Sequence, residues 1–448
     1  MTPLPFQPAP SLAQLSGARV CIWGIGSHGG GMAAAALCAL HGAQVHLLDQ
    51  HPEPHRSVVA QQGWLLDQGH VDHPWLRQMD WVIVSPAITP RTLSQLPHDH
   101  APLSAAEGWC LANHQHPRIM VTGTKGKSST AAILGALLGW PVMGNSWTPM
   151  AAAWPGSAQL PWICELSSFQ LAQLARQAPS FSCAILTSLD RDHLDWHGDL
   201  EQYHASKLNG LRWAQHLAVP SQLQHLLPQE RLLPLVQLKE QHFVDQHGSI
   251  LAQRSDLPLL GSHHASNACL ALSVALHHGL DPTQCAARLR QTAQLPHRLQ
   301  VIHRDARYTI IDDSTATTPL ASRAALASID GPVALILGGH DKGGDFSELW
   351  RDLRARQHRM VLLIGDCAEA LALSCIQAKI PFQRCVNLHT AVTNGLAWIA
   401  SAPDSGTLLL APACASFGSF QDFADRGRQF AQAVQASLQD MDMSPESP

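Results

Sequence analysis

The segment Val121–Thr130, with the sequence VTGTKGKSST, has the residue types of a phosphate-binding loop. Gly123 and Gly126 let the backbone curl so that several N–H groups point at a phosphate, and a following helix adds its positive N-terminal end. Lys127 could then reach the β- and γ-phosphates of a nucleotide, and the Ser128 hydroxyl could bind Mg²⁺. The usual spacing G-x-x-x-x-G-K-[ST] needs glycine where this chain has valine. The alternative, a glycine-rich turn with an incidental lysine, is disfavoured by the strand pattern before the loop and the helix pattern after it.

Glu165 is a second residue whose type and place suggest chemistry, because it ends the short apolar segment Trp162–Glu165. A carboxylate at the end of a strand is placed to hold Mg²⁺ beside the Ser128 hydroxyl. A solvated charge at a strand end is the alternative for an isolated glutamate.

Composition limits the class of protein. At roughly 150 residues per domain, 448 residues are enough for about three domains. A net charge of −5 argues against a nucleic-acid groove or an anionic membrane surface as the main partner. Eleven cysteines without a C-x-x-C pair indicate neither a disulfide framework nor a zinc site. Without a secretory signal or an apolar run of roughly 20 residues, we expect a soluble, cytoplasmic protein with no membrane insertion.

The first part of the chain has the order of elements of a dinucleotide-type fold. A strand at 19–23 runs into a glycine turn, a helix at 32–41 and a strand at 44–48 that ends at Asp49, and a further strand is expected at 81–85. This order predicts a Rossmann-like domain. A lone glycine fingerprint is a weak sign of a bound dinucleotide, because a tight turn gives the same pattern.

Two further α/β blocks follow. Short apolar strands separated by helical stretches predict parallel sheets covered by helices. These strands are expected at 162–165 and 183–187, and then at 309–312, 333–337, 360–364 and 407–410. We therefore predict an α/β protein of three domains: a Rossmann-like domain at 1–115, a central P-loop-type ATPase sheet at 116–298 and a second Rossmann-like domain at 299–448.

The shorter loop form T-G-T-x-G-K-[ST]-[ST] resembles the Mur ligase superfamily of ATP-dependent, amide-bond-forming enzymes. The segment Glu165–Leu171 resembles the E-L-S-S-F-Q-L segment of its glutamate-adding branch. Matches to the family extend over nearly the whole chain. The resemblance implies that the three domains bind, in chain order, the UDP-linked substrate, ATP and the amino acid.

The resemblance also implies a site for two Mg²⁺ ions. Ser128 and Glu165 would hold one ion. The segment Asp192–Gly198 resembles the family's D-H-x-D segment, whose histidine, here His193, holds the second. Lys207 matches a lysine that the family carbamylates, and a carbamate is the anion that a Mg²⁺ site needs. The expected catalytic residues are Lys127, His193, Lys207 and Lys342.

The resemblance assigns ATP to the phosphate loop and to four residues beyond it. Asn145 lies in a match to G-N-x-G-x-P, in which Trp147 replaces the second glycine. Asn267 ends a match to G-x-H-N-x-x-N, in which His264 replaces the first asparagine, and Arg298 ends an L-P-H-R motif. Asp313 matches an aspartate that binds the ribose. The expected ATP-binding residues are Gly123, Thr124, Lys125, Gly126, Lys127, Ser128, Ser129, Asn145, Asn267, Arg298 and Asp313.

The resemblance assigns the two other substrates to the outer domains. UDP is expected on Gly26, Ser27, His28 and Asp49, and on Ser85 in a match to S-P-G-I. The glutamate pocket is expected to contain Ser416 and Phe423, with Lys342 near the acceptor and the γ-phosphate. Thr315 is also assigned to this pocket, but many relatives have lysine there, within D-S-K-A-T-N, and that lysine helps to hold a glutamate carboxylate.

The implied enzyme joins D-glutamate to UDP-N-acetylmuramoyl-L-alanine through an acyl phosphate, as a monomer, in cytoplasmic peptidoglycan precursor synthesis. Because of Thr315, L-glutamate is the main alternative acceptor, and a Mur-type ligase with another amino acid is a further one. A folylpolyglutamate synthase lacks a UDP-type first domain. A non-catalytic nucleotide-binding regulator would not need the set of Lys127, Ser128, Glu165, His193, Lys207 and Arg298.

Overall fold

The computed structural model describes residues 4–26, 29–340, 343–402 and 405–443. The chain divides into two compact units. The N-terminal unit contains residues 1–257 and 265–292, and the C-terminal unit contains residues 258–264 and 293–448. No described helix combines the length and the apolar character that a membrane crossing requires.

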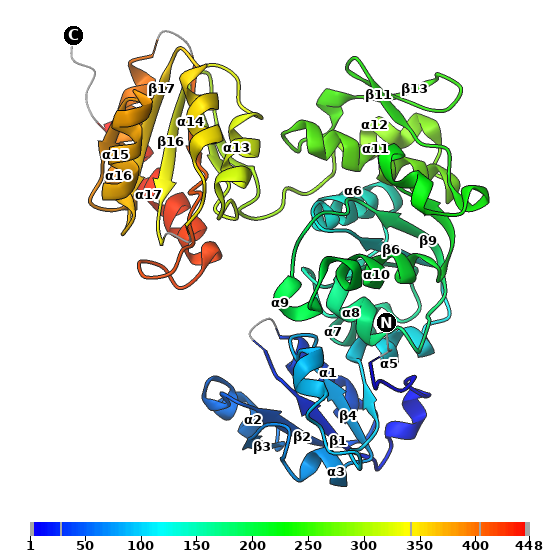
Figure 1. Cartoon of the computed structure of the whole chain (residues 1–448). Coiled ribbons are helices and arrows are strands. Elements are labelled where there is room, and N and C mark those ends of the chain that lie inside the picture. The colour runs from blue at the N-terminus through cyan, green and yellow to red at the C-terminus, as the bar shows by residue number, and fades with distance from the viewer. Residues whose placement is uncertain (1–3, 27–28, 341–342, 403–404, 444–448) are drawn as a thin grey trace. The chain divides into compact units, whose positions relative to one another are not determined.

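The first sheet of the N-terminal unit has parallel strands in the order β3-β2-β1-β4-β5 (Figure 1), the order of a dinucleotide-binding fold. Its strands are β1 Arg19–Trp23, β2 Gln44–Asp49, β3 Leu65–Gln68, β4 Trp81–Val84 and β5 Leu103–Ser104. The helices of this part are α1 Gly30–Leu40, α2 Arg56–Gln61, α3 Trp75–Gln78, α4 Pro90–Leu93 and α5 Ala106–Asn113.

The second sheet of the same unit is also parallel, with the order β10-β9-β6-β8-β7. Its strands are β6 Arg118–Thr122, β7 Val142–Gly144, β8 Trp162–Glu165, β9 Phe181–Leu186 and β10 Ala214–Ala218. The helices are α6 Lys127–Leu138, α7 Met150–Ser157, α8 Ser168–Gln173, α9 Leu194–His197, α10 Leu200–Leu211, α11 Ser262–His277 and α12 Cys285–Leu289.

A small antiparallel sheet that the sequence did not predict completes this unit. It contains β11 Gln237–Lys239, β12 His242–Val244 and β13 Ile250–Gln253. The strands are very short, and all of β11 is exposed, so they form no apolar run that a sequence pattern would reveal.

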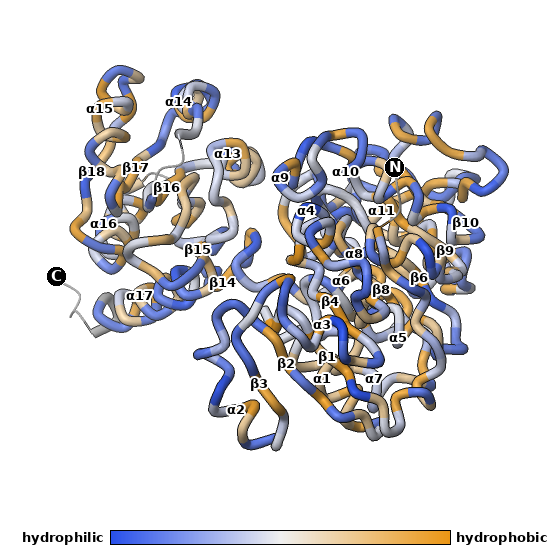
Figure 2. The backbone as a smooth tube through the Cα atoms, turned by 60° about the horizontal axis from the view of Figure 1, so that its bottom comes forward, coloured by the Kyte–Doolittle hydropathy of each residue, from blue (hydrophilic) through white to orange (hydrophobic). Residues whose placement is uncertain are grey.

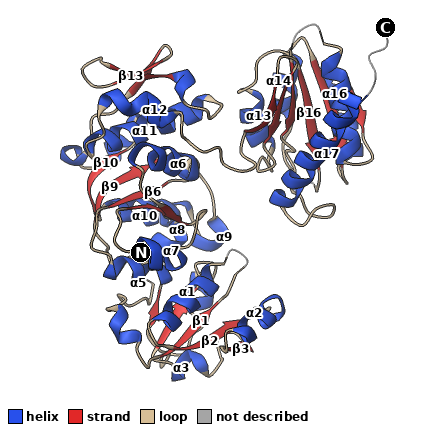
Figure 3. Ribbon diagram, turned by 180° about the vertical axis from the view of Figure 1, so that it is seen from behind, coloured by secondary structure: helices blue, strands red, loops and turns tan. Residues whose placement is uncertain are grey.

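The C-terminal unit has one sheet in the order β14-β15-β19-β16-β17-β18, parallel except for β14 at its edge. Its strands are β14 Gln300–Arg304, β15 Tyr308–Asp312, β16 Val333–Gly338, β17 Arg359–Ile364, β18 Phe382–Arg384 and β19 Gly406–Leu410. Its helices, on both faces of the sheet (Figure 3), are α13 Pro319–Leu326, α14 Ser347–Arg354, α15 Ala368–Ala378, α16 Leu388–Ala400 and α17 Phe423–Met443.

Apolar strands covered by helices explain these layers. Every residue of β8, β16 and β19 is buried, which is typical of parallel strands packed on both faces, and Figure 2 shows how hydrophobic and hydrophilic stretches alternate along the chain. One buried apolar cluster includes Ile22 of the first sheet and Met120 of the second, so the two sheets of the N-terminal unit share a core. The predicted fold class is confirmed, and the predicted domain boundaries stay a prediction.

The start of the C-terminal unit is tied to its sheet by His297. The Nδ1 atom of His297 lies 2.7 Å from Oδ2 of Asp312, the last residue of β15, and the carbonyl of His297 accepts a hydrogen bond from the backbone N–H of Thr315. His297 and Leu299 both have positive φ angles, +60° and +44°, which the surrounding contacts must stabilise. A side chain on Gly427 of α17 would overlap the imidazole ring, so the glycine makes room for it.

We expect Gly427→Ala to destabilise the protein by up to about 2 kcal/mol. Overpacking costs about 1–3 kcal/mol, and the better helix propensity of alanine offsets about 1 kcal/mol of that cost. Denaturant unfolding of the variant measures the difference.

The control is the same substitution in a His297→Ala background, where the ring that meets the new methyl group is absent. There Gly427→Ala should be neutral or stabilising by up to about 1 kcal/mol. An equal loss of stability in both backgrounds would contradict the role of His297.

Candidate active site

The predicted phosphate loop lies between β6 and α6, where a strand, a loop and a helix meet. Gly123 and Gly126 have φ angles of +148° and +84°, which favour glycine. Space requires glycine as well, because a Cβ atom on Gly126 would lie 2.9 Å from Oδ1 of Asn267 on α11, and one on Gly123 would overlap the Thr187 hydroxyl. The loop is therefore packed from both sides, and it leads directly into the N-terminus of α6, the end of a helix at which anions bind.

Two lysine ammonium groups share one carbonyl of this loop. Nζ of Lys127 donates to the carbonyl oxygens of Gly123 and Thr124, at 2.9 and 3.0 Å. Nζ of Lys207, which is buried on α10, donates to the same Gly123 oxygen at 3.0 Å. Burial, and after it the charge of Lys127, lowers the pKa of Lys207 to about 7. The two ammonium groups place positive charge where nucleotide phosphates are expected. The lowered pKa also allows Lys207 to lose its proton near neutral pH.

Glu165 lies beside this loop because β8 is the parallel neighbour of β6. Its carboxylate is fully buried, and Oε1 accepts hydrogen bonds from Oγ of Ser128 at 3.2 Å and from Nδ2 of Asn145 at 3.0 Å. Oε2 accepts a hydrogen bond from Nε1 of Trp147 at 2.9 Å. The structure thus brings together Ser128, Asn145 and Glu165, and it adds Trp147, which the sequence analysis noted only as a departure from a family pattern.

The segment that contains His193 packs against the same loop. The His193 ring contacts the rings of Phe169 and Tyr203, and the Tyr203 hydroxyl donates to Oγ1 of Thr124 at 3.0 Å. Burial is the largest cause that lowers the pKa of His193, and the charges of Lys127 and Lys207 lower it further while Asp192 opposes them. His193 therefore lies within the electrostatic reach of both lysines.

The oxygen atoms of this site suit a hard cation whose coordination is completed by phosphate. Within the described part of the chain, no three His, Cys, Asp or Glu side chains form a group that could hold a metal ion by themselves. Mg²⁺ usually binds to one or two carboxylates together with substrate phosphates and water. The Ser128 hydroxyl and the Glu165 carboxylate, in direct contact beside a phosphate loop, have the chemistry of such a site.

A cavity of about 430 Å³ adjoins Glu165 in the N-terminal unit. Its wall combines the glycine turn after β1, the segment after β4 and the loop after β7, including Gly26, Ser85, Asn145 and Trp147. Its volume is in the range of small-molecule sites. A ligand in this cavity would reach from the first sheet to Asn145 and Trp147, the two cavity residues that hydrogen-bond to the Glu165 carboxylate.

Asp49 supports the glycine turn rather than lining this cavity. Its Oδ2 accepts a hydrogen bond from the backbone N–H of Ile25 at 2.7 Å, and its Oδ1 accepts one from that of His51 at 2.8 Å. The expected role of Asp49 in binding UDP stays a prediction. Ser27 and His28, two other residues expected to bind UDP, lie outside the described residues.

In the C-terminal unit, the predicted ribose and acceptor residues follow β15 and β19. Asp313 is buried, and burial raises its pKa to about 6 although the Arg298 charge and two hydrogen bonds oppose the shift. Its Oδ1 accepts from the Leu299 backbone N–H and from Oγ1 of Thr315, at 3.3 and 3.1 Å. The Thr315 hydroxyl is thus engaged within the loop. Lys342 lies outside the described residues.

Arg426 on α17 holds the loops after β15 and β19 together, and no sequence pattern indicated this role. Its buried guanidinium donates to Oγ and the carbonyl oxygen of Ser314 and to the carbonyl oxygen of Cys414, at 3.0, 2.9 and 3.1 Å. Oγ of Ser314 in turn donates to the carbonyl of Phe423 at 2.7 Å. Arg426 therefore positions the segments that contain Ser416, which is buried, and Phe423, which is exposed.

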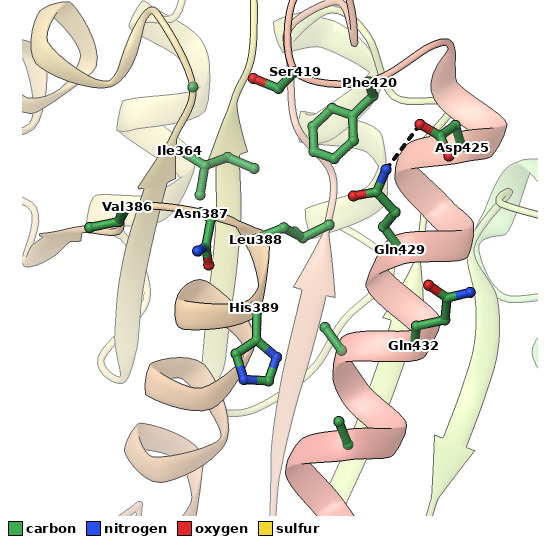
Figure 4. A pocket seen from close by; sticks show the side chains of 13 residues that line it. Ile364, Val386, Asn387, Leu388, His389, Ser419, Phe420, Asp425, Gln429 and Gln432 are labelled. Atoms are coloured by element: carbon green, nitrogen blue, oxygen red, sulfur yellow. Dashed lines mark hydrogen bonds between the residues drawn. The ribbon is translucent and has the colours of Figure 1, made fainter.

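A separate cavity of about 800 Å³ lies between α16 and α17, near the end of β17 (Figure 4). Asp425 and Gln429 are hydrogen-bonded to each other on its wall, with Phe420 beside them. None of the residues that the sequence assigned to a substrate or a metal lines this cavity.

Comparison with known proteins identifies the family. Residues 155–213 match the Mur ligase middle domain, and residues 297–414 match the Mur ligase glutamate ligase domain. A UDP-N-acetylmuramoyl-L-alanine–L-glutamate ligase of Xylella fastidiosa is 30% identical, over 94% of this chain and 96% of that protein. A UDP-N-acetylmuramoylalanine–D-glutamate ligase of Deinococcus radiodurans is also 30% identical, over 96% of this chain and 95% of that protein.

Solved structures share the fold at lower identity. The UDP-N-acetylmuramate–alanine ligase MurC of Thermotoga maritima has a TM-score of 0.60 and 17% identity, over 94% of this chain and all of that chain. MurF of Acinetobacter baumannii has a TM-score of 0.56 and 16% identity, over 96% of this chain and all of that chain. With a phosphate loop, a buried carboxylate and two lysines assembled as described above, and with relatives matching along almost its entire length, the chain belongs to the Mur ligase family.

Proposed function

We propose that the protein is an ATP-dependent ligase that joins glutamate to UDP-N-acetylmuramoyl-L-alanine in cytoplasmic peptidoglycan precursor synthesis. The observation that carries the proposal is the cavity that runs from the glycine turn after β1 to Asn145 and Trp147, beside Glu165 and the phosphate loop. This arrangement suits an acyl substrate held by its nucleotide at one end and presenting its carboxylate to ATP at the other. The names of the relatives support the same substrates.

In the proposed reaction, the carboxylate of the acyl substrate attacks the γ-phosphate of ATP, and the bond between that phosphate and ADP breaks. Phosphoryl transfer requires mainly positioning and charge neutralisation. Lys127 and the N–H groups at the start of α6 would hold the phosphates, and the family resemblance assigns Arg298 and Asp313 to ATP as well. The glutamate amine then attacks the acyl carbon and loses a proton, and phosphate leaves as the amide forms.

We further propose two Mg²⁺ ions, one at Ser128 and Glu165 and one at His193 and a carbamate on Lys207. When bound, the ions neutralise charge on the phosphates. Carbamylation begins with attack of a neutral amine on CO₂, after which the carbamic acid releases a proton. The lowered pKa of Lys207, about 7, leaves a substantial neutral fraction near neutral pH. Protonated Lys207 would instead repel the metal that its modified form attracts.

The handedness of glutamate is the finer part of the proposal. Relatives of equal identity are named for each enantiomer. The D-glutamate predicted from the sequence is based on the E-L-S-S-F-Q-L segment and on Lys342, Ser416 and Phe423. Thr315, where many relatives have lysine, is the observation against it. The Thr315 hydroxyl donates to Asp313 and supplies no charge. We therefore propose L-glutamate as the acceptor, with D-glutamate as the alternative.

Lys127→Ala should lower kcat/KM for ligation about a hundredfold or more, because it removes a preorganised cation from the phosphates. Binding of UDP-N-acetylmuramoyl-L-alanine, measured by calorimetry, should change little, since Lys127 does not line the cavity. Loss of both properties in a folded variant would show that the two ligands do not occupy separate sites.

Lys207→Ala should also lose most activity, and a small carboxylate such as acetate should restore part of it by taking the place of the carbamate. Lys127→Ala is the matched control, because its missing group is a cation that no carboxylate can replace. Rescue of neither variant across a series of small acids would refute the carbamate, and rescue of both would indicate an unspecific salt effect.

Wild-type protein should form product with a higher kcat/KM for L-glutamate than for D-glutamate. Thr315→Lys should raise the relative use of D-glutamate, because a charge-assisted hydrogen bond contributes about 1.5–3 kcal/mol. Leu320→Lys adds the same charge at an exposed position on α13 and should leave the ratio unchanged. If the wild type forms product with D-glutamate alone, the acceptor is D-glutamate, as the sequence predicts.

A further inference from the structure

Trp147 stands in a tight loop between β7 and α7 that is bonded to the end of β8. The loop closes on itself, since the N–H of Trp147 donates to the carbonyl of Gly144 and the N–H of Gly144 donates to that of Thr148, both at 3.0 Å. The N–H of Asn145 donates to the carbonyl of Glu165 at 3.0 Å. Gly144 has a φ angle of +106°, and a side chain on it would overlap the Glu165 backbone. Backbone hydrogen bonding and close packing therefore join the loop to Glu165.

The indole of Trp147 is directed at the Glu165 carboxylate. Oε1 accepts hydrogen bonds from the Ser128 hydroxyl and the Asn145 amide, whereas Oε2 accepts one from Nε1 of Trp147 at 2.9 Å. An indole N–H only donates, so it can hold an ionised carboxylate without competing for a cation. Two hydrogen bonds on one oxygen and one on the other fix the rotation of the carboxylate plane.

The family pattern G-N-x-G-x-P has glycine at this position, and glycine has no side-chain donor. In this chain the indole supplies a contact that such a pattern lacks. Its ring also forms part of the cavity wall, together with Phe169, Asn145 and Pro149. The same side chain thus lies between the cavity and the carboxylate beside the phosphate loop.

We propose that Trp147 is a positioning residue with two separable actions in this chain: its N–H fixes the Glu165 carboxylate for a divalent cation, and its ring forms a wall of the acyl-substrate cavity. The inference rests on the proposed function and assigns a role to the departure from the family pattern. Because the N–H and the ring are different parts of one side chain, substitutions can separate the two actions.

The test measures binding rather than turnover. Mn²⁺ titrations, followed by electron paramagnetic resonance with a non-hydrolysable ATP analogue present, report the cation site. Calorimetry with UDP-N-acetylmuramoyl-L-alanine reports the cavity. Trp147→Phe keeps a ring but loses the N–H, so Mn²⁺ should bind about tenfold more weakly, the size of effect seen when a residue that orients a metal ligand is removed. Its affinity for the UDP substrate should stay within about twofold.

Trp147→Gly restores the family residue and removes both parts of the side chain. Both affinities should then fall, that for the UDP substrate by about fivefold or more because an aromatic wall is lost. Trp154→Phe is the matched control, since the Trp154 ring packs edge-on against Trp162 in the same unit, and it should change neither affinity. If Trp147→Phe does not fold, Trp147→Gly alone must weaken both affinities.

The outcomes separate this inference from the proposed function. Wild-type protein that binds neither Mn²⁺ with the ATP analogue nor the UDP substrate would refute the proposed function. Wild-type protein that binds both, with Trp147→Phe unchanged in its Mn²⁺ affinity, would refute the positioning role of Trp147 and leave the ligase intact.

Discussion

The carbonyl oxygen of Gly123 accepts hydrogen bonds from two lysines, and the rest of the site depends on this contact. Two ammonium groups so close to each other repel, and one of them, on Lys207, is buried. The arrangement becomes favourable when an anion is added or when one lysine loses its charge. Under the proposed function, a nucleotide phosphate would be the added anion. The lowered pKa of Lys207 favours the loss of its charge. The positive charge beside the loop thus favours the binding of an anion.

The parallel sheet explains how these groups come together. β6, β8 and β9 are neighbours, so the phosphate loop, Glu165 and the segment that leads to His193 all leave the sheet at the same edge. Glycines at 123, 126 and 144 then allow backbone and side chains to approach where a Cβ atom would not fit. The strands supply the coarse position of each group, and the glycines supply the close contact.

The sequence was sufficient for the features that depend on local pattern. Apolar runs located the main parallel strands to within a residue or two, and the loop was recognisable from its glycines and Lys127. Lys207 and His193 were identified by resemblance alone, since no spacing rule predicts that Lys207 reaches Gly123. The sequence did not predict the roles of Trp147 and Arg426 or the contact of His297 with Gly427. Each of these depends on the direction of side chains between segments that are distant in the chain. Short polar strands such as β11 were not predicted because they have no apolar pattern.

Arg426 bears on how an acidic acceptor could be held without a lysine at position 315. Its guanidinium is fully buried, and its hydrogen bonds go to neutral oxygens of Ser314 and Cys414. Burial lowers its pKa to about 10, which still leaves it charged at neutral pH. The negative charge of Asp312 raises the pKa and so favours the charged guanidinium, and Asp312 is itself hydrogen-bonded to His297. Neutral oxygens orient the guanidinium, which keeps its charge beside the loops that follow β15 and β19. Under the proposed function, a glutamate carboxylate at these loops would be attracted by a fixed, buried cation instead of a mobile lysine, and its orientation would then be set by the shape of the loops.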